Sequence, residues 1–133
     1  MNGRYRQTGT TTSLLQYHFV FCPRYRRKIF QIDGLEAQFR TLVYQICEQN
    51  KMEVLSLECC TDHVRLSISA LPSLRPENIM KIIRRNTTSA ILKAYPDILH
   101  GPTLWTRNYF VTTEKRVSEA TIMQYVNAQK MRL

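Results

Sequence analysis

The chain has 133 residues, 44% of them hydrophobic, which suffices for one folded domain with one core and leaves little room for a second. Nineteen lysines and arginines outnumber ten acidic residues, so the net charge of +9 favours a polyanionic partner such as nucleic acid. No run approaches the roughly 18 apolar residues of a transmembrane helix, and residues 1–13 lack the apolar core of a signal peptide. We therefore expect a cytoplasmic protein without membrane contact, in which residues 1–133 form one domain and residues 1–13 a flexible N-terminal segment.

The first half of the chain predicts a strand, a helix and a hairpin. Residues 14–22 are rich in aromatic and β-branched side chains and stop at Pro23, which indicates a strand. Residues 35–49 repeat apolar side chains every three or four positions, the period of a helix lying on a core. Residues 52–60 and 63–70 are two short strand-like runs, and the second alternates apolar with polar side chains.

The second half predicts a helix, a strand and a final helix. Pro76 stands where a helix covering residues 77–94 would begin. Residues 104–113 combine aromatic and β-branched side chains and indicate the fourth strand. The last helix would follow Ser118 as its N-cap, with Glu119 in the first turn.

The order β-α-β-β-α-β plus a C-terminal helix predicts an α+β, ferredoxin-like fold. It is an antiparallel four-stranded sheet with two helices on one face. His63 and Arg65 share a face of their strand, opposite to the apolar side chains. The C-terminal helix, which carries Tyr125, is then free to cover that second face, in its own subunit or in a partner's.

Two basic clusters predict contacts to a nucleic-acid backbone. The first cluster is Arg24, Arg26, Arg27 and Lys28, and the second is Lys81, Arg84 and Arg85 on one helical face. Each alone is also compatible with an ordinary solvated surface, but the overall charge favours phosphate contacts, and Tyr25 within the first cluster suits base stacking.

Cysteine and histidine spacing gives no zinc pattern. The four cysteines show no C-x-x-C spacing, so we expect reduced thiols packed as small apolar side chains. His18, inside the first predicted strand, is expected to be a structural histidine.

Tyr125 and Gln129 lie one helical turn apart. A tyrosine hydroxyl has a pKa of about 10 and needs help to act as a nucleophile, which a divalent cation on the attacked phosphate supplies. A glutamine oxygen and the His63 imidazole form a mixed ligand set that suits Mg²⁺ or Mn²⁺ better than structural zinc. On spacing alone, a packed tyrosine beside a solvated glutamine is the simpler interpretation.

Four segments together resemble a known family. They read YHFVFCPRYRRKIF, ECCTDHVRL, LWTRNYFVTT and VSEATIMQYVNAQK. These strings, in this order, resemble the small single-tyrosine HUH transposases of IS200-like insertion sequences, which move as single-stranded DNA. The resemblance covers residues 14–130 and implies a ferredoxin-like fold, a single-stranded DNA substrate with a terminal hairpin, and a homodimer.

The resemblance also implies roles for single residues. Tyr125 matches the nucleophile that leaves a 5′-phosphotyrosine and a free 3′-OH, Gln129 a ligand of Mg²⁺ or Mn²⁺, and His63 the first histidine of the His-hydrophobic-His motif. Arg65 stands where the second histidine is expected. Arginine has no lone pair for a metal, and a divalent cation about 4 Å away would be repelled by about 8 kcal/mol at an effective dielectric of about 20.

Two consequences of Arg65 are open. Arg65 either replaces part of the cation's role by clamping the phosphate directly, or metal-dependent cleavage is impaired or lost while DNA binding is kept; we favour the second. The predicted function is a transposase that binds hairpin ends and cleaves and rejoins single-stranded DNA, and the alternative is an inactive hairpin-binding relative. A third interpretation, an RNA-binding domain of this topology, needs exposed aromatic side chains where Arg65, Ser67 and Ser69 stand.

Overall fold

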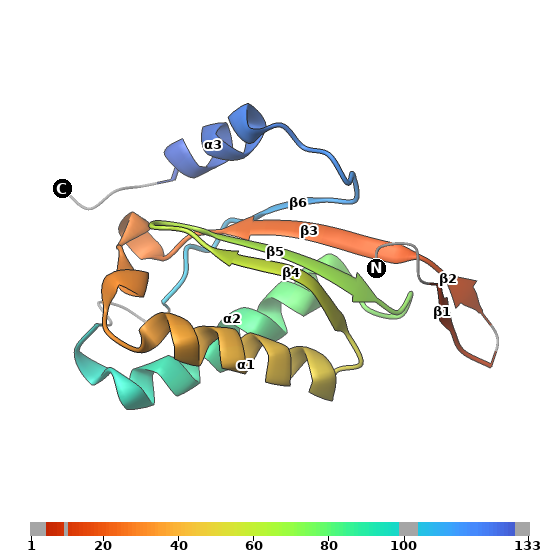
Figure 1. Ribbon diagram of the computed structural model, residues 1–133, viewed down its shortest axis with the longest axis horizontal. Helices are drawn as coiled ribbons and strands as arrows, with labels where there is room; N and C mark the ends of the chain where they lie inside the picture. The colour runs from red at the N-terminus through yellow and green to blue at the C-terminus, as the bar shows by residue number, and fades with distance from the viewer. Residues whose placement is uncertain (1–4, 10, 99–103, 130–133) are drawn as a thin grey trace.

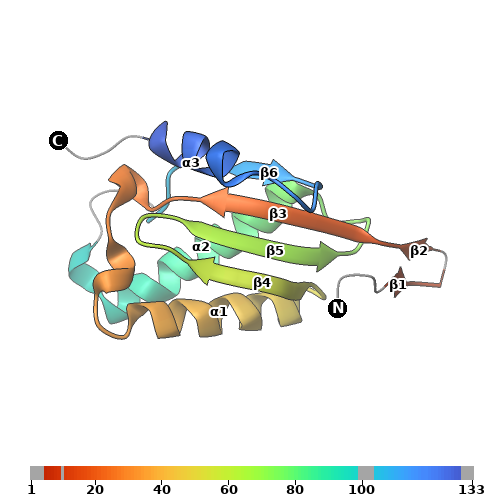
Figure 2. The same cartoon turned by 45° about the horizontal axis from the view of Figure 1, so that its top comes forward.

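The computed structural model describes residues 5–9, 11–98 and 104–129, and its centre is a four-stranded antiparallel sheet (Figure 1). The strands are β4 (Glu53–Cys59), β5 (Val64–Ala70), β3 (Leu15–Phe21) and β6 (Phe110–Thr112), in that spatial order. Figure 2 shows β3 and β5 in the middle and β4 and β6 at the edges. This α+β, ferredoxin-like arrangement confirms the predicted fold class.

Helices lie on both faces of the sheet. Helices α1 (Leu35–Gln49) and α2 (Pro76–Ala94) cover one face, and α3 (Glu119–Asn127) lies over the other (Figure 1). Pro76 occupies the first turn of α2, and the Ser118 hydroxyl accepts a hydrogen bond from the Thr121 N–H at 3.1 Å to cap α3. All three predicted helices are confirmed to within a residue or two.

The main core lies between the sheet and the α1–α2 layer. Val64, Leu66 and Ile68 alternate along β5 and are at most 1% exposed, as the predicted alternation requires. Trp105 packs edge-on against Phe21, with ring centroids 5.0 Å apart. Each such side chain contributes about 1.5–3 kcal/mol by leaving water, so this layer dominates the stability of the domain.

Part of the predicted fourth strand is irregular, and here the prediction is wrong. Only Phe110–Thr112 pairs in the sheet as β6, while Trp105 forms an isolated antiparallel bridge with Pro23. The Trp105 indole enters the core and donates to the Thr87 hydroxyl at 3.0 Å. Arg84 binds the carbonyls of Thr106 and Arg107 at 2.7 and 2.8 Å. High β-propensity in this segment thus leads to one isolated bridge and to packing, not to a continuous strand.

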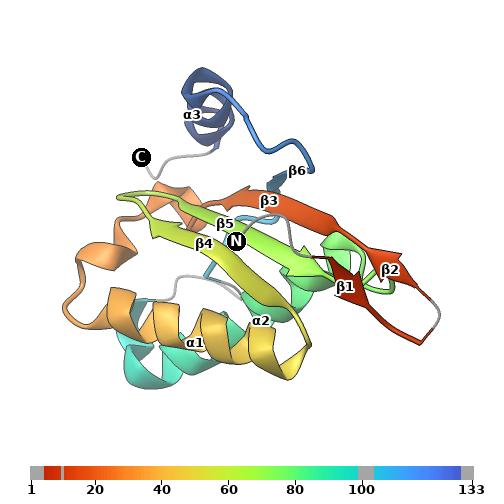
Figure 3. The ribbon, with the colours of Figure 1, turned by 45° about the vertical axis from the view of Figure 1, so that its right-hand side comes forward.

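Smaller elements complete the described chain. Within residues 1–13, β1 (Arg6–Gln7) pairs with β2 (Thr12–Ser13) in a short hairpin beyond the end of the sheet (Figure 3), an element that the sequence did not indicate. Residues 1–4 and 10 of this segment lie outside the described residues. The described residues also form three 3₁₀ turns: η1 (Arg24–Arg26), η2 (Ile29–Gln31) and η3 (Pro96–Ile98). None of the helices in the described ranges is long and apolar enough to cross a membrane.

The cysteines are free thiols, as predicted. Burial raises the pKa of Cys22 to about 12 and that of Cys47 to about 11. Both therefore stay protonated at neutral pH and behave as small apolar side chains.

Candidate active site

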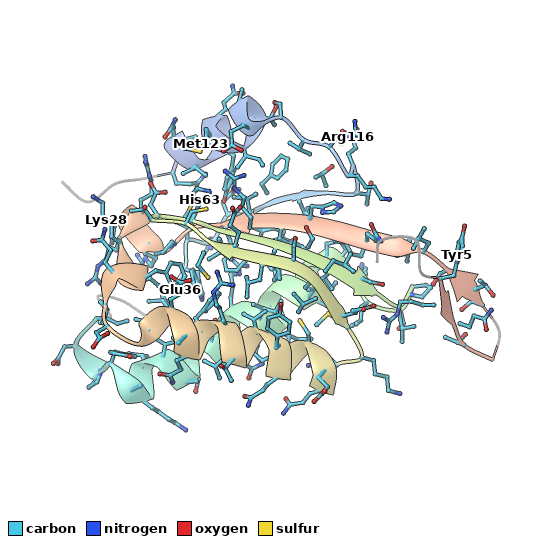
Figure 4. All side chains as sticks on the ribbon, in the orientation of Figure 1. Tyr5, Lys28, Glu36, His63, Arg116 and Met123 are labelled. Atoms are coloured by element: carbon cyan, nitrogen blue, oxygen red, sulfur yellow. The ribbon has the colours of Figure 1, made fainter. Side chains whose placement is uncertain are left out.

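His63 lies at the turn between β4 and β5, directly before the first residue of β5. Figure 4 places it at the end of the sheet beneath α3, at the same end of the molecule as Lys28 and opposite Tyr5. Its side chain is buried, with 4% of its residue surface exposed. A buried imidazole needs partners for both ring nitrogens, and both are found within the chain.

Asp62 holds one side of the His63 ring. The His63 Nδ1 lies 3.0 Å from Asp62 Oδ1, and because a carboxylate only accepts, Nδ1 carries the proton. Asp62 Oδ2 accepts from Arg26 Nη2 at 2.8 Å and Nε at 3.1 Å. Burial alone would raise the pKa of Asp62, but hydrogen bonds from His63 and Arg26 outweigh it and leave that pKa below its usual value. Asp62 thus stays charged and fixes the ring orientation.

Arg65 holds the other side of the ring. Its Nε donates to His63 Nε2 at 3.2 Å, so the imidazole is the neutral tautomer with its free lone pair already used. Its Nη1 donates to Glu119 Oε1 at 2.9 Å, and Nη2 donates to Glu119 Oε2. Glu58 Oε1 is 3.6 Å from Nε. The hydrogen bonds between Arg65 and Glu119 raise the pKa of the guanidinium and lower the pKa of the carboxyl.

These residues do not fit a divalent cation in the arrangement observed. The His63 lone pair that would ligate the metal accepts the Arg65 N–H instead, and a positive guanidinium stands beside it. Gln129, two residues beyond the end of α3, donates from Nε2 to the Tyr125 carbonyl at 3.0 Å. Across the described ranges, no group of three His, Cys, Asp or Glu side chains is placed to hold a metal ion.

Tyr125 projects from α3 into a small apolar cluster. Its ring centroid is 6.0 Å from that of Phe110, and its hydroxyl donates to the Asn108 carbonyl at 3.0 Å. Burial is the main reason that the pKa of Tyr125 is raised above its usual value, and the neighbouring Cys22 thiol adds to this shift. Tyr125 is therefore a neutral phenol whose hydroxyl proton is donated in a hydrogen bond to a backbone carbonyl.

The structure brings some predicted site residues together and adds others. His63 and Arg65, which were expected to share a face, are hydrogen-bonded to each other, whereas the side-chain hydrogen bonds of Tyr125 and Gln129 described above go to the backbone. The sequence had indicated Glu119 only as a first-turn helix residue and did not single out Asp62 for a role in the site. Asp62 could have been found by its position next to His63, but Glu119 is 54 residues from Arg65 and no spacing links the two.

The first basic cluster is partly engaged inside the protein. Arg26 is bound to Asp62, and Arg27 Nη1 donates to the Ile98 carbonyl. Arg24 lies over the Tyr25 ring, 5.4 Å from its centroid, and Lys28 is exposed. Lys28 is therefore the member most open to solvent.

The second basic cluster borders a groove of about 410 Å³ between α2 and the segment before β6. Lys81 and Arg85 are exposed, whereas Arg84 is half-buried, binds two backbone carbonyls and lies 5.1 Å from the Tyr109 ring centroid. Burial lowers the pKa of Arg84. Arg107 lines the same groove and was missed, because no regular pattern in the sequence links it to α2.

A cleft of about 470 Å³ opens beside Arg65 on the α3 side of the sheet. Its lining includes His18, Phe110 and Lys115. His18 Nδ1 lies 2.7 Å from the Ser67 hydroxyl, and burial lowers the pKa of His18, which agrees with the predicted structural role.

Comparisons with known proteins agree with this architecture. The family model described as "Transposase IS200 like" matches residues 11–129. The ISDra2 transposase TnpA of Deinococcus radiodurans is 30% identical over 118 residues, which cover 86% of this chain and 84% of that protein. The transposase for insertion sequence element IS200 of Salmonella typhimurium is 26% identical over 117 residues, 86% of this chain and 76% of that protein.

Solved structures point the same way. A crystal structure of a putative transposase from Deinococcus radiodurans R1 superposes with a TM-score of 0.84 at 25% identity, covering 96% of this chain and 99% of that one. A REP-associated tyrosine transposase bound to a REP hairpin shares the fold, with a TM-score of 0.59 at 10% identity over 94% of this chain and 68% of that one. The chain is thus a member of the IS200-like transposase family of insertion sequences.

Proposed function

We propose that this transposase binds hairpin-ended single-stranded DNA and carries Tyr125 as its nucleophile, and that its metal-dependent cleavage is impaired by Arg65. The observation that carries the proposal is the 3.2 Å hydrogen bond from Arg65 Nε to His63 Nε2. It uses the lone pair that a metal ligand needs. DNA binding does not depend on that lone pair and is retained.

The proposed reaction is a transfer of the DNA phosphate to Tyr125. The phenolic oxygen forms a bond to phosphorus, the bond from phosphorus to the 3′-oxygen breaks, and the phenolic proton ends on that oxygen. The products are a 5′-phosphotyrosine and a free 3′-OH, and reversal with another 3′-OH rejoins strands. The raised pKa of Tyr125 means that the phenol needs activation before it attacks, and the arrangement around His63 does not supply it.

The DNA backbone is proposed to follow the groove beside α2. Lys81, Arg85 and Arg107 supply positive charge there, and Arg84 shapes the wall by holding the Thr106 and Arg107 carbonyls. Lys28, with the other residues of the first cluster, supplies a second contact near His63. Phosphate contacts of this kind give affinity without sequence preference.

We also propose that the protein acts as a homodimer. Within the described chain, β4 and β6 are edge strands, and an open sheet edge can pair with a second copy. Light scattering behind a sizing column should give twice the 15.7 kDa mass of one chain. A mass of 15.7 kDa at all concentrations tested would contradict this part of the proposal.

A covalent-adduct assay tests the proposed chemistry. The protein is incubated with Mn²⁺ or Mg²⁺ and a labelled hairpin-ended single strand, and protein-linked label is measured on a denaturing gel. We expect Arg65→His to form more adduct than the wild type, and Arg65→His with Tyr125→Phe to form none. Equal metal-dependent adduct from the wild type and Arg65→His would show that Arg65 does not impair cleavage.

The second candidate function is hairpin binding without chemistry, and the same hydrogen bond from Arg65 to His63 favours it. It predicts no adduct from the wild type under any metal condition but measurable hairpin binding. An adduct from the wild type that Tyr125→Phe abolishes would exclude this candidate.

A further inference from the structure

The guanidinium of Arg65 is bound on its outer edge by a surface carboxylate. Nη1 and Nη2 donate to the two oxygens of Glu119 in parallel, while Nε donates to the buried His63. A guanidinium binds a phosphate with this same pair of donors, because both anions present two oxygens in one plane. Glu119 thus occupies the position that a DNA phosphate would take on Arg65.

The two partners of Arg65 differ in how firmly they are held. His63 is 4% exposed and fixed by Asp62, so its hydrogen bond from Arg65 Nε holds the arginine in place on the buried side. The Glu119 side chain is 66% exposed, and its contact to Arg65 comes from the first turn of α3. Exposed ion pairs are weak and are screened by salt, so an incoming anion can replace Glu119 without disturbing the core.

Arg65 is also reachable from solvent. Its side chain is 25% exposed and lines the cleft of about 470 Å³ between the sheet and residues 114–117. Lys115 adds positive charge to the same cleft, while Glu58 and Glu114 add negative charge. Once Glu119 is displaced, one phosphate on Arg65 restores the local charge balance.

We propose that Arg65 is a binding site for a phosphate of the DNA backbone and that Glu119 is its built-in competitor, which the DNA must displace. This inference rests on the proposed function only in taking DNA as the ligand. It needs neither cleavage nor a metal ion. Arg65, which stands where the family has a second histidine, then has a binding role of its own: it blocks the metal position and makes the phosphate contact.

Binding of an unstructured single strand to the full chain tests the inference. Fluorescence anisotropy with a labelled oligothymidine at several salt concentrations compares the wild type with Glu119→Gln. The matched control is Glu36→Gln, since Glu36 is also a first-turn glutamate paired to an arginine, with Arg40 Nε 2.9 Å from its Oε2, but lies on α1 on the opposite face of the sheet. Both variants raise the net charge by one unit.

We expect Glu119→Gln to bind several-fold more tightly than Glu36→Gln. A plot of log affinity against log salt should be shallower by about 0.7 for Arg65→Met than for Glu119→Gln, because only Glu119→Gln keeps the phosphate contact of Arg65 on single-stranded DNA. Arg65→Met should bind the strand more weakly than the wild type. In the Arg65→Met background, Glu119→Gln should raise the affinity by no more than Glu36→Gln does.

Three results would overturn the inference. They are equal gains from Glu119→Gln and Glu36→Gln, a gain from Glu119→Gln that persists in Arg65→Met, or no binding of the strand by any variant. Failure of the proposed function appears elsewhere, as the absence of adduct from Arg65→His, so the two failures are distinguishable. If Glu119→Gln does not fold, the comparison of Arg65→Met with the wild type still decides, because unchanged affinity contradicts the phosphate site.

Discussion

The two faces of the sheet are built differently. The face under α1 and α2 buries a large continuous apolar core that includes Phe39, Leu66 and Trp105. On the face under α3, the apolar cluster found among the described residues is small: Val20, Cys22 and Val126 are buried, with partly buried neighbours around them. Stability is therefore concentrated on one face. The other face keeps its polar and titratable groups close to solvent, where a strand of DNA can reach them.

Polar contacts as well as packing hold α3 on the sheet. Its first turn is tied to β5 by the pair of Glu119 and Arg65, and its last turn is tied to the segment before β6 by the hydrogen bond from the Tyr125 hydroxyl to the Asn108 carbonyl. Such contacts can be exchanged for contacts to a ligand at little cost, whereas a packed core cannot be rearranged in this way.

Phe39→Ala should give the largest loss of stability. Phe39 is fully buried and packs against Phe30 and Trp105, with ring centroids 5.2 and 5.4 Å away. We expect the free energy of unfolding to fall by about 3–5 kcal/mol, measured by urea denaturation followed by circular dichroism. A loss below 1 kcal/mol would mean that the α1–α2 face is not the stabilising face.

Val126→Ala tests the opposite face by the same measurement. Val126 is fully buried, but its cluster is small. Removing about two methylene groups should lower the free energy of unfolding by about 1.5 kcal/mol, clearly less than Phe39→Ala. A loss as large as that of Phe39→Ala would remove the contrast between the two faces.

The phenol of Tyr125 should ionise late in an alkaline titration. Burial raises the pKa of Tyr125 above the ordinary value, so the phenol stays neutral through pH 10, where free tyrosine is half ionised. The difference in tyrosinate absorbance between the wild type and Tyr125→Phe isolates this group. A difference that appears at the ordinary pH would show that Tyr125 is solvated and not packed on Phe110.

The carboxyl of Glu119 should titrate below an ordinary glutamate. Its pKa is lowered by hydrogen bonds from Arg65, so the ion pair is complete above the ordinary glutamate pKa and is lost as the pH falls through the lowered one. Carbon-13 NMR of the side-chain carboxyl follows the titration, and Arg65→Met should return Glu119 to the ordinary range. An unchanged titration in Arg65→Met would mean that the pair does not persist in solution.

Local patterns predicted much of this molecule, and long-range contacts did not follow from them. Helix periods located α1 and α2 closely, and strand alternation placed His63 and Arg65 on one face. The irregular segment around Trp105 could not be read from propensity, because its backbone is held by Arg84 from another element. The pairing of Arg65 with Glu119 depends on how α3 docks on the sheet, which the sequence does not encode in any spacing.

Manganese binding tests whether Arg65 occupies the metal position at His63. The free Mn²⁺ signal in electron paramagnetic resonance is measured during titration into the wild type, Arg65→His, and Arg65→His combined with His63→Ala. We expect no uptake at this site by the wild type, uptake by Arg65→His, and loss of that uptake when His63 is also replaced. Mn²⁺ uptake by the wild type as strong as that of Arg65→His, and dependent on His63, would contradict it.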